Sequence, residues 1–379
     1  MSEDLKRRVQ VEIDLGALVR NYRKIAAHVK PLSVLCVLKA NAYGLGVEAY
    51  AAALAKTDCV GFGVAEPFEA LQLAGKYGKR VQLLSSVLPD EIEAMVAADV
   101  ALPIIDLESA RLISVAAVRL GKVARVHFKI DTGMGRLGIL AEEALAVIRK
   151  VEQLPSLACE GIFSHCPMAY DPKDSFTARQ IGLFKSIVAA AQKEGFSFPF
   201  VHMAASDAIN NFPETAQAPF TMVRTGINLH GSFDPYGRKT LQVEPVLTLR
   251  TRVAQVRSLP AGTTLGYGRT WCLREPTRVA TISAGYADGL PLALSNRGQV
   301  IIGGRYCPVI GRISMDYTTV DVSAVEGVKP GDEVICLGRD GDCSITPDDW
   351  ATLKGTHAYD IICSLGSRVE RVVKQSAEG

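Results

Sequence analysis

The sequence predicts a mixed α/β protein: an N-terminal (β/α)8 TIM-like barrel over residues 1–240, followed by a mostly β C-terminal domain over residues 241–379. Three observations predict this fold. A chain of 379 residues has enough core for two domains. Between residues 30 and 230, short β-rich runs alternate with segments of helical periodicity. After residue 241, β-rich runs follow one another across Gly- and Pro-bearing turns.

Eight short apolar runs are the expected strands of the barrel. The segments between them have apolar residues three and four positions apart, as in 89–98 and 107–120, and are expected to be helices. Strands with two apolar faces indicate a parallel sheet, and eight such units suit a closed barrel better than an open doubly wound sheet. The expected strands are Val34–Leu38, Val60–Val64, Val81–Leu84, Val100–Ile105, Ala124–Ile130, Cys159–Phe163, Phe200–Ala204 and Met222–Arg224.

The second domain is expected to contain several strands and one short helix. Thr346-Pro347 has the pattern of a helix N-cap followed by proline at the first helical position, which places that helix late in the domain. Residues 1–13 could add a strand to the same domain. The expected strands are 246–256, 278–282, 299–302 and 333–337.

Composition argues against several classes of function. A net charge of +2 with 22% charged residues provides no basic excess for nucleic acid or an acidic membrane surface. The first fifteen residues are rich in charge and no run of eighteen apolar residues occurs, so we expect a cytoplasmic protein. The nine cysteines include no C-x-x-C pair, which predicts no metal site. Cys36, Cys336 and Cys363 are expected to be small buried core residues.

Lys39 is the first candidate for chemistry, because it directly follows the apolar run 31–38. A lysine that is partly desolvated at a strand end loses its charge readily and can form a Schiff base with an aldehyde. The ordinary alternative is a surface lysine.

Other polar residues follow the other expected strands. In a barrel the carboxyl ends of all strands meet at one face, which is where barrel active sites lie. Each residue taken singly has an ordinary explanation, such as a surface ion pair or a hydrogen-bonded core imidazole, but their shared position indicates an active site. The candidates are Lys39, Lys129 with Asp131 and Arg136, His165, Ser206, and Arg224 with Gly226.

Ser206 and Gly226 indicate what the site could hold. Barrels often bind phosphate in the loops after strands seven and eight, where a hydroxyl donates and glycine allows a close backbone approach. A lysine that faces a phosphate site suits pyridoxal phosphate. Position alone does not distinguish this cofactor from the phosphorylated substrate of a barrel aldolase.

The sequence resembles the bacterial alanine racemase family in seven motifs spread over nearly the whole chain. The motifs occur in the family's order and at its spacings. They are Lys39-Ala-Asn-Ala-Tyr-Gly44, Lys129-Ile-Asp-Thr-Gly-Met134 with Arg136 and Gly138, Phe163-Ser-His165, Arg224-Thr-Gly-Ile227, Gly266-Tyr-Gly-Arg-Thr270, Gly285-Tyr-Ala-Asp-Gly289 and Met315-Asp316.

The resemblance implies a role for each matching residue of the cofactor site. Lys39 would be the Schiff-base lysine for pyridoxal 5'-phosphate. Arg224 would face the pyridine nitrogen, and His165 would pack near the ring. The phosphate would be held by Tyr43, Ser206, Gly226, Ile227 and Tyr359.

The resemblance also implies a homodimer with shared active sites. Tyr267, Met315 and Asp316 would come from the neighbouring subunit, and Tyr286 would support them. Arg136 would face the substrate carboxylate. Lys129 matches a lysine that is carbamylated in the family, and its negative charge would hold Arg136.

A racemase needs two bases, because the α-proton must leave and return on both faces of a planar intermediate. Lys39 and Tyr267 are the expected pair, acting on the aldimine that the substrate forms with the cofactor. Tyr267 needs neighbours that favour its phenolate, a role that His165 could fill. Arg224 stays protonated, so the ring nitrogen beside it stays uncharged, which should suppress transamination.

The expected function is therefore L-/D-alanine racemisation, supplying D-alanine for cell-wall peptidoglycan. The closest alternative is a serine or broad-specificity racemase, although the presence of Lys129 favours alanine. A barrel-type pyridoxal-phosphate decarboxylase would have a glycine-rich phosphate loop and a catalytic cysteine instead of Arg224-Thr-Gly-Ile227 and Tyr267. The chain departs from the family pattern at Ala205, His230 and 166–171, which leaves substrate access open.

Overall fold

The computed structural model describes residues 7–374, which form two compact units. One unit comprises residues 19–229 and 236–243 and is called the barrel unit here. The other comprises residues up to 18, then 230–235 and 244 onward, and is called the β unit. The boundary at residue 18 falls inside helix α1 (Leu15–His28).

The barrel unit contains the eight expected parallel strands. Strands β10, β2, β3 and β4 form one sheet, and β5, β6, β8 and β9 form another. A parallel bridge between Gln82 and Ala101 joins β4 to β5, and backbone bonds Thr221 N to Val201 O (2.9 Å) and Arg224 N to Ala204 O (3.0 Å) join β10 to β9. The strands are β2 (Ser33–Val37), β3 (Gly61–Val64), β4 (Arg80–Leu83), β5 (Leu102–Ile104), β6 (Ala124–Asp131), β8 (Leu157–Phe163), β9 (Phe200–His202) and β10 (Met222–Thr225).

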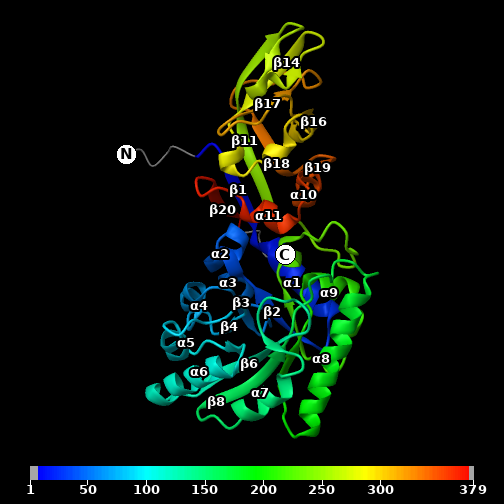
Figure 1. Cartoon of the computed structure of the whole chain (residues 1–379). Helices are drawn as coiled ribbons and strands as arrows, with labels where there is room; N and C mark the ends of the chain where they lie inside the picture. The colour runs from blue at the N-terminus through cyan, green and yellow to red at the C-terminus, as the bar shows by residue number, and fades with distance from the viewer. Residues whose placement is uncertain (1–6, 375–379) are drawn as a thin grey trace. The chain divides into compact units, whose positions relative to one another are not determined.

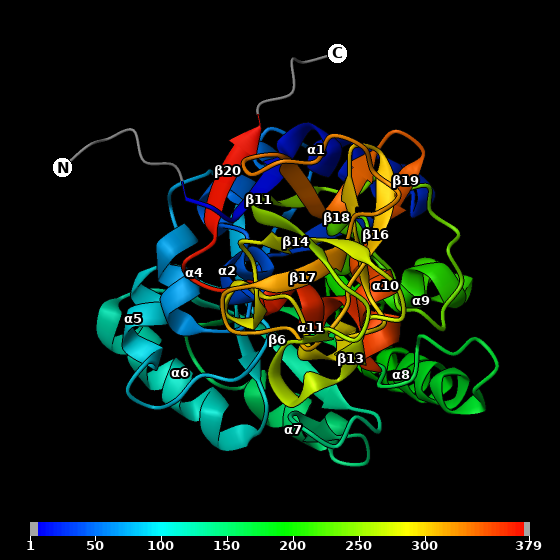
Figure 2. The same ribbon diagram turned by 90° about the horizontal axis from the view of Figure 1, so that it is seen from above.

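Helices cover the outside of these strands (Figure 1). Seen from above, α4 to α8 follow one another in an arc (Figure 2), and each contacts the next. A short strand, β7 (Ile139–Leu140), pairs with β6 and was not predicted. The helices after α1 are α2 (Lys39–Gly44), α3 (Val47–Leu54), α4 (Pro67–Leu73), α5 (Ile92–Ala97), α6 (Leu107–Leu120), α7 (Ala144–Val151), α8 (Ser175–Lys193) and α9 (Ser206–Asn211).

Local sequence explains where these elements begin and end. Helix α6 begins where the Asp106 side chain accepts a hydrogen bond from Ser109 N, and it ends at Gly121, which has φ of 61°. All residues of β3, β5 and β10 are buried, as a closed parallel sheet under helices requires. The α/β fold with a barrel is confirmed.

The β unit is built on the long strand β11 (Leu247–Leu259). Its first part pairs with β1 (Gln10–Asp14) and β18 (Glu333–Asp340), and its second part pairs with β14 (Thr277–Ile282). Strand β1 also pairs in parallel with β20 (Glu370–Lys374). The remaining strands are β12 (Thr264–Leu265), β13 (Trp271–Cys272), β15 (Gln299–Ile302), β16 (Arg305–Pro308), β17 (Thr318–Asp321) and β19 (Cys343–Ile345).

Two predictions for the β unit need correction. Helix α10 (Pro347–Lys354) begins as expected, with Thr346 accepting from Asp349 N, but a second helix, α11 (Ala358–Cys363), follows it. Cys36 and Cys336 are buried, whereas Cys363 is exposed. Helix α11 buries Ala358, Ile361 and Ile362, so its last residue lies on the opposite face.

Candidate active site

Positive side chains gather around His165 at the carboxyl end of the barrel strands. Burial and then, in decreasing order of importance, the charges of Arg224, Arg136, Lys39 and Lys129 together lower the pKa of His165 to about 3. Electrostatic influence of this kind requires short separations. The structure therefore brings together the five cationic or imidazole groups that the sequence placed after different strands.

Lys39 lies where β2 has just ended and α2 begins. Its side chain is exposed in the single chain, as are Ala40 and Asn41. The predicted partial desolvation is therefore wrong for the single chain. The predicted position beside the other site residues is what the structure shows.

The turn after Lys39 is left-handed. Residues 40–43 have φ between 51° and 59°, although none of them is glycine. Each such residue is strained, since its Cβ approaches the following carbonyl. Glu69 Oε1 accepts from Asn41 N (2.8 Å), and Asn41 Oδ1 accepts from Val47 N (2.9 Å). These bonds hold the turn in its unusual conformation and bury the ring of Tyr43.

The expected phosphate ligands of the barrel unit lie together. Gly226 N donates to Ser206 Oγ (3.1 Å), and both residues follow neighbouring strands. A Cβ on Gly226 would lie only 2.2 Å from Tyr43 Oη, so the missing side chain is what allows the phenol to reach this position. Ile227 follows directly and is fully buried. Two hydroxyls and a side-chain-free backbone thus meet beside a cluster of cations, which suits a phosphate.

Arg224 is buried and firmly held. Its Nη1 donates to His202 Nδ1 (2.7 Å), and its Nη2 donates to Ser164 O (2.8 Å) and Met203 O (2.9 Å). Burial lowers its pKa to about 10, which leaves it protonated at neutral pH. Within residues 7–374, Nε of Arg224 makes no hydrogen bond, so this N–H remains for a group bound in the site.

Lys129, Asp131 and Arg136 come from one strand end. Lys129 is buried and its Nζ donates to Leu84 O (2.7 Å) and Ser85 O (3.3 Å), so the surface ion pair with Asp131 is not what forms. Burial, followed by the charges of Arg136 and Arg224, lowers the pKa of Lys129 to about 8. Asp131 instead accepts from backbone N–H groups at 133 and 135, which shapes the loop that carries Arg136.

Tyr267 lies in the β unit, at the tip of the hairpin formed by β12 and β13. Leu265 and Leu273 anchor this hairpin in a buried cluster with Val279 and Ile310. The glycines on both sides of Tyr267 have positive φ (67° and 74°), and the side chain itself is 73% exposed. The phenol is therefore presented outward on a firmly attached loop.

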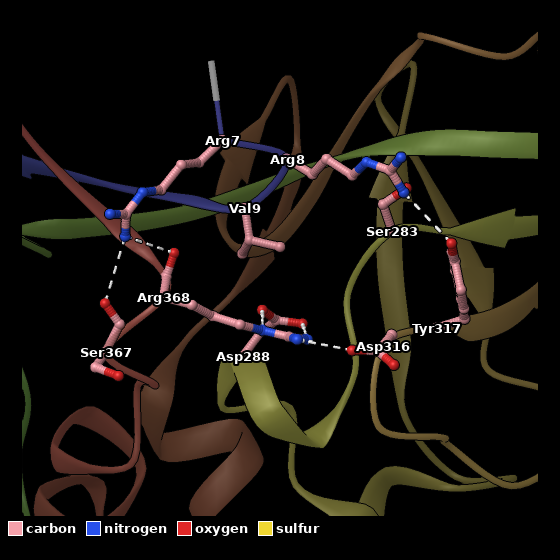
Figure 3. Close-up of a pocket in the computed structure, with 9 residues that line it drawn as sticks. All are labelled: Arg7, Arg8, Val9, Ser283, Asp288, Asp316, Tyr317, Ser367 and Arg368. Atoms are coloured by element: carbon pink, nitrogen blue, oxygen red, sulfur yellow. Dashed lines mark hydrogen bonds and ion pairs between the residues drawn. The ribbon is translucent and has the colours of Figure 1, made fainter. Parts of the chain in front are cut away.

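The remaining candidates also belong to the β unit. Met315 and Tyr286 are exposed, and Tyr359 in α11 contacts the ring of His357 edge-on at 5.3 Å. Asp316 lines a hollow of about 620 Å³ and accepts from Arg368 Nη1 (2.7 Å). Figure 3 shows Arg368 between Asp288 and Asp316.

Sequence reasoning missed several polar residues inside the barrel. His127 lies two positions before Lys129 on β6, and His202 ends β9; both are buried. Glu69 was missed as well. The alternation of side chains along a strand places His127 on the same face as Lys129, and this signal could have revealed it.

A closed β/α barrel with a lysine after its first strand, an anion-binding end and a following β domain is the architecture of a class of barrel enzymes. Comparison with known proteins places the chain within that class. The alanine racemase N-terminal domain matches residues 13–234, and the alanine racemase C-terminal domain matches residues 246–373.

Comparison with individual relatives identifies the same family. The chain is 37% identical to the alanine racemase of Chlorobaculum tepidum over 95% of this chain and 94% of that protein. It also matches the crystal structure of alanine racemase from Streptomyces lavendulae, with a TM-score of 0.89, 31% identity and 99% of both chains covered. A structure from Bartonella henselae, with covalently bound pyridoxal phosphate, matches with a TM-score of 0.87, 30% identity, and 97% and 100% covered. The chain belongs to the alanine racemase family, and the resemblance seen in the sequence is confirmed.

Proposed function

We propose that this protein is a pyridoxal-phosphate-dependent isomerase that interconverts L-alanine and D-alanine. Membership of the alanine racemase family supports this function. The observation that carries it is the gathering of Lys39, Lys129, Arg136 and Arg224 around a neutral His165. The relative from Bartonella henselae holds pyridoxal phosphate covalently, and one from Bacillus anthracis binds L-Ala-P.

The barrel unit fits the cofactor. Tyr43, Ser206, Gly226 and Ile227 provide hydroxyl and backbone groups for the phosphate. Tyr359 stays a predicted phosphate ligand that rests on the family resemblance alone. Nε of Arg224 is left to face the ring nitrogen. When bound, pyridoxal phosphate supplies an aldehyde for the Lys39 amine and a conjugated ring that accepts the electrons left by the α-proton.

Lys39 and Tyr267 are the proposed acid–base pair. One of them would remove the α-proton from one face of the substrate, and the other would deliver a proton to the opposite face, which inverts the configuration; the roles exchange for the other enantiomer. Arg224 keeps its own proton, since its pKa remains about 10 despite burial, and so it leaves the ring nitrogen unprotonated. This limits the lifetime of the deprotonated substrate and disfavours side reactions.

His165 acts through hydrogen bonding and not through charge. Its pKa of about 3 leaves it neutral, so it would favour the Tyr267 phenolate as a hydrogen-bond donor. Its Nδ1 lies 3.5 Å from Arg224 Nη2, an obligate donor. The ring proton is then on Nε2, which would donate toward the phenolate of the Tyr267 that the partner subunit contributes.

Arg136 would bind the substrate carboxylate, held by a modified Lys129. A pKa of about 8 leaves part of the Lys129 amine neutral near pH 7. A neutral amine adds to carbon dioxide, forming an N–C bond and releasing one proton, and the carbamate carries a negative charge. That charge would attract Arg136 and the other nearby cations.

The active site is proposed to be shared in a homodimer. Tyr267 and Met315 expose 73% and 52% of their surface, and Tyr286 exposes 46%. Exposed aromatic groups on a firmly anchored loop are typical of residues that a partner subunit covers. Tyr267, Met315 and Asp316 would therefore complete the partner's site. Within residues 7–374, no helix is long and apolar enough to span a membrane. A cytoplasmic role in supplying D-alanine for peptidoglycan is part of the proposal.

Hydrogen exchange at Cα tests the two-base assignment. In D2O, wild-type protein should exchange the α-hydrogen of both alanine enantiomers, and Tyr267→Phe should lose exchange of one enantiomer while its cofactor absorbance stays intact. Loss of that absorbance would mean that Tyr267 holds the cofactor instead. Borohydride should attach the cofactor to Lys39, and attachment elsewhere would refute the role of Lys39. L-Serine assayed beside L-alanine distinguishes a broad-specificity racemase.

A further inference from the structure

A continuous chain of polar side chains crosses the interior of the barrel. We call it the imidazole chain: Arg224 of β10, His202 of β9, His127 of β6, Glu160 of β8 and Arg80 of β4. Arg224 Nη1 is 2.7 Å from His202 Nδ1, His202 Nε2 is 3.2 Å from His127 Nδ1, and His127 Nε2 is 3.2 Å from Glu160 Oε1. Arg80 donates to the same oxygen of Glu160.

The chemistry of the two ends sets the direction of every hydrogen bond in the imidazole chain. Arg224 can only donate, so His202 Nδ1 accepts and the ring proton of His202 is on Nε2. His202 Nε2 therefore donates to His127 Nδ1, which places the proton of His127 on Nε2. That proton is donated to the carboxylate of Glu160. Both imidazoles are thus held as Nε2–H tautomers.

Both imidazoles stay neutral. Burial lowers the pKa of His127 and, more strongly, that of His202. Burial alone would raise the pKa of Glu160, but the hydrogen bonds from His127 and Arg80 lower it below its ordinary value. Glu160 is therefore the anionic end of the imidazole chain at neutral pH.

The surrounding packing restrains the planes of both rings. The His202 ring stacks on Phe163 with centroids 4.9 Å apart and planes 2° apart, and the His127 ring stacks on Phe200 at 5.7 Å and 16°. A Cβ on Gly161 would lie 2.1 Å from His127 Nδ1, so glycine makes room for this ring. Burying several polar side chains in a packed barrel interior costs free energy unless each of them is hydrogen-bonded.

Charge explains why the imidazole chain ends in a carboxylate. Within residues 7–374, Arg224 makes no direct ion pair, although it is a buried cation. Buried charges need compensation. The imidazole chain connects Arg224 to Glu160, and hydrogen bonds in series polarise one another, so the carboxylate makes His202 Nδ1 a stronger acceptor.

We propose that Glu160 is a positioning residue for the active site. Acting through His127 and His202, it fixes the tautomers of both rings and the orientation of Arg224, whose Nε then faces the bound ring nitrogen. The effect on catalysis rests on the proposed function. The effect on the histidines does not, since it concerns only residues of this chain.

Histidine NMR tests the proposal directly. The protein has six histidines, so selective 15N-histidine labelling gives few signals. In cofactor-free protein, His127 and His202 should both appear as Nε2–H tautomers. Glu160→Gln removes the charge and should shift the signals of His202, which Glu160 does not touch. The matched control is Glu194→Gln, which breaks the exposed Arg149–Glu194 pair outside the barrel and should leave both histidines unchanged.

Two further variants keep the proposal testable if Glu160→Gln does not fold. His127→Phe keeps a ring on Phe200 but breaks the imidazole chain, and it should also shift His202. Glu160→Asp retains the charge and should restore part of the wild-type signal. In the loaded protein, Glu160→Gln should lower kcat for alanine about tenfold with KM nearly unchanged, as losses of outer partners typically do.

The outcomes separate this proposal from the proposed function. An unchanged His202 signal in Glu160→Gln, or kcat within about twofold of wild type, would overturn the positioning role. Wild-type protein that shows the expected tautomers but does not racemise alanine would overturn the function and leave the tautomer assignment standing.

Discussion

Gly226 shows how one missing side chain builds the phosphate end of the site. Its backbone N–H donates to Ser206 Oγ, and the space at its Cα is filled by the Tyr43 hydroxyl. The sequence identified Gly226 as a place for close backbone approach. The family resemblance grouped Tyr43 with Gly226, but the residues alone could not reveal their close contact, because it depends on the pairing of β2 with β10, which are far apart in the sequence.

Gly226→Ala should destabilise the protein by about 1–3 kcal/mol, because the new Cβ would overlap Tyr43 Oη. It should also weaken cofactor retention. Adding Tyr43→Phe removes the hydroxyl and should recover part of the stability. The control is Gly182→Ala, inside α8 with no atom within 4 Å, which should stabilise by roughly 0.5–1 kcal/mol. Urea unfolding of the wild type and of these three variants measures this, and equal effects at both glycines would contradict it.

At the scale of elements, the helices and strands could be predicted from the sequence, whereas unusual backbone conformations could not. Strands such as β2 and β10 were found because they are short apolar runs, α6 because its apolar residues recur three and four positions apart, and α10 because Thr346-Pro347 marks its start. The left-handed turn after Lys39 left no trace in the sequence, since residues 40–43 contain no glycine. Long-range bonds from Glu69 impose it, and these follow only from the tertiary fold.

The strain in this turn can be tested by the direction in which a glycine substitution changes the free energy of unfolding. Ala40 is exposed with φ of 54°, so Ala40→Gly should relieve steric strain and raise the free energy of unfolding by about 1 kcal/mol. The matched control is Ala52→Gly, at an exposed position of the right-handed helix α3, which should lower it by about 1 kcal/mol. Thermal or urea unfolding compares them, and two changes of the same sign would show that the turn is not strained.

At the scale of the whole molecule, the two predicted architectures are present and the convergence of site residues within the barrel unit follows from them. The division at residue 240 and the sharing of sites between subunits stay predictions. The imidazole chain was not predicted, because it depends on which residues of five different strands lie at the same level. Strand registers decide this, and a single sequence carries little information about them.

The buried histidines also set the response of the whole molecule to acid. Burial lowers the pKa of His165 and of His230 to about 3, and the pKa values of His127 and His202 are also lowered. In the unfolded chain these groups return to about 6.5. The unfolded state therefore binds more protons below pH 6.5, so stability is complete above this pH and is lost as the pH falls toward 3.

His165 and His230 should each add about 1.4 kcal/mol per pH unit to the slope of stability between pH 6 and pH 4.5, before most carboxylates are protonated. His230→Phe, in the β unit, should reduce the slope of stability against pH by the contribution of one histidine. His28→Phe, at an exposed position, is the matched control and should leave the slope unchanged. The free energy of unfolding in urea at several pH values gives the slope. If His230→Phe leaves the slope unaltered, the imidazole is not buried as a neutral group in the folded protein.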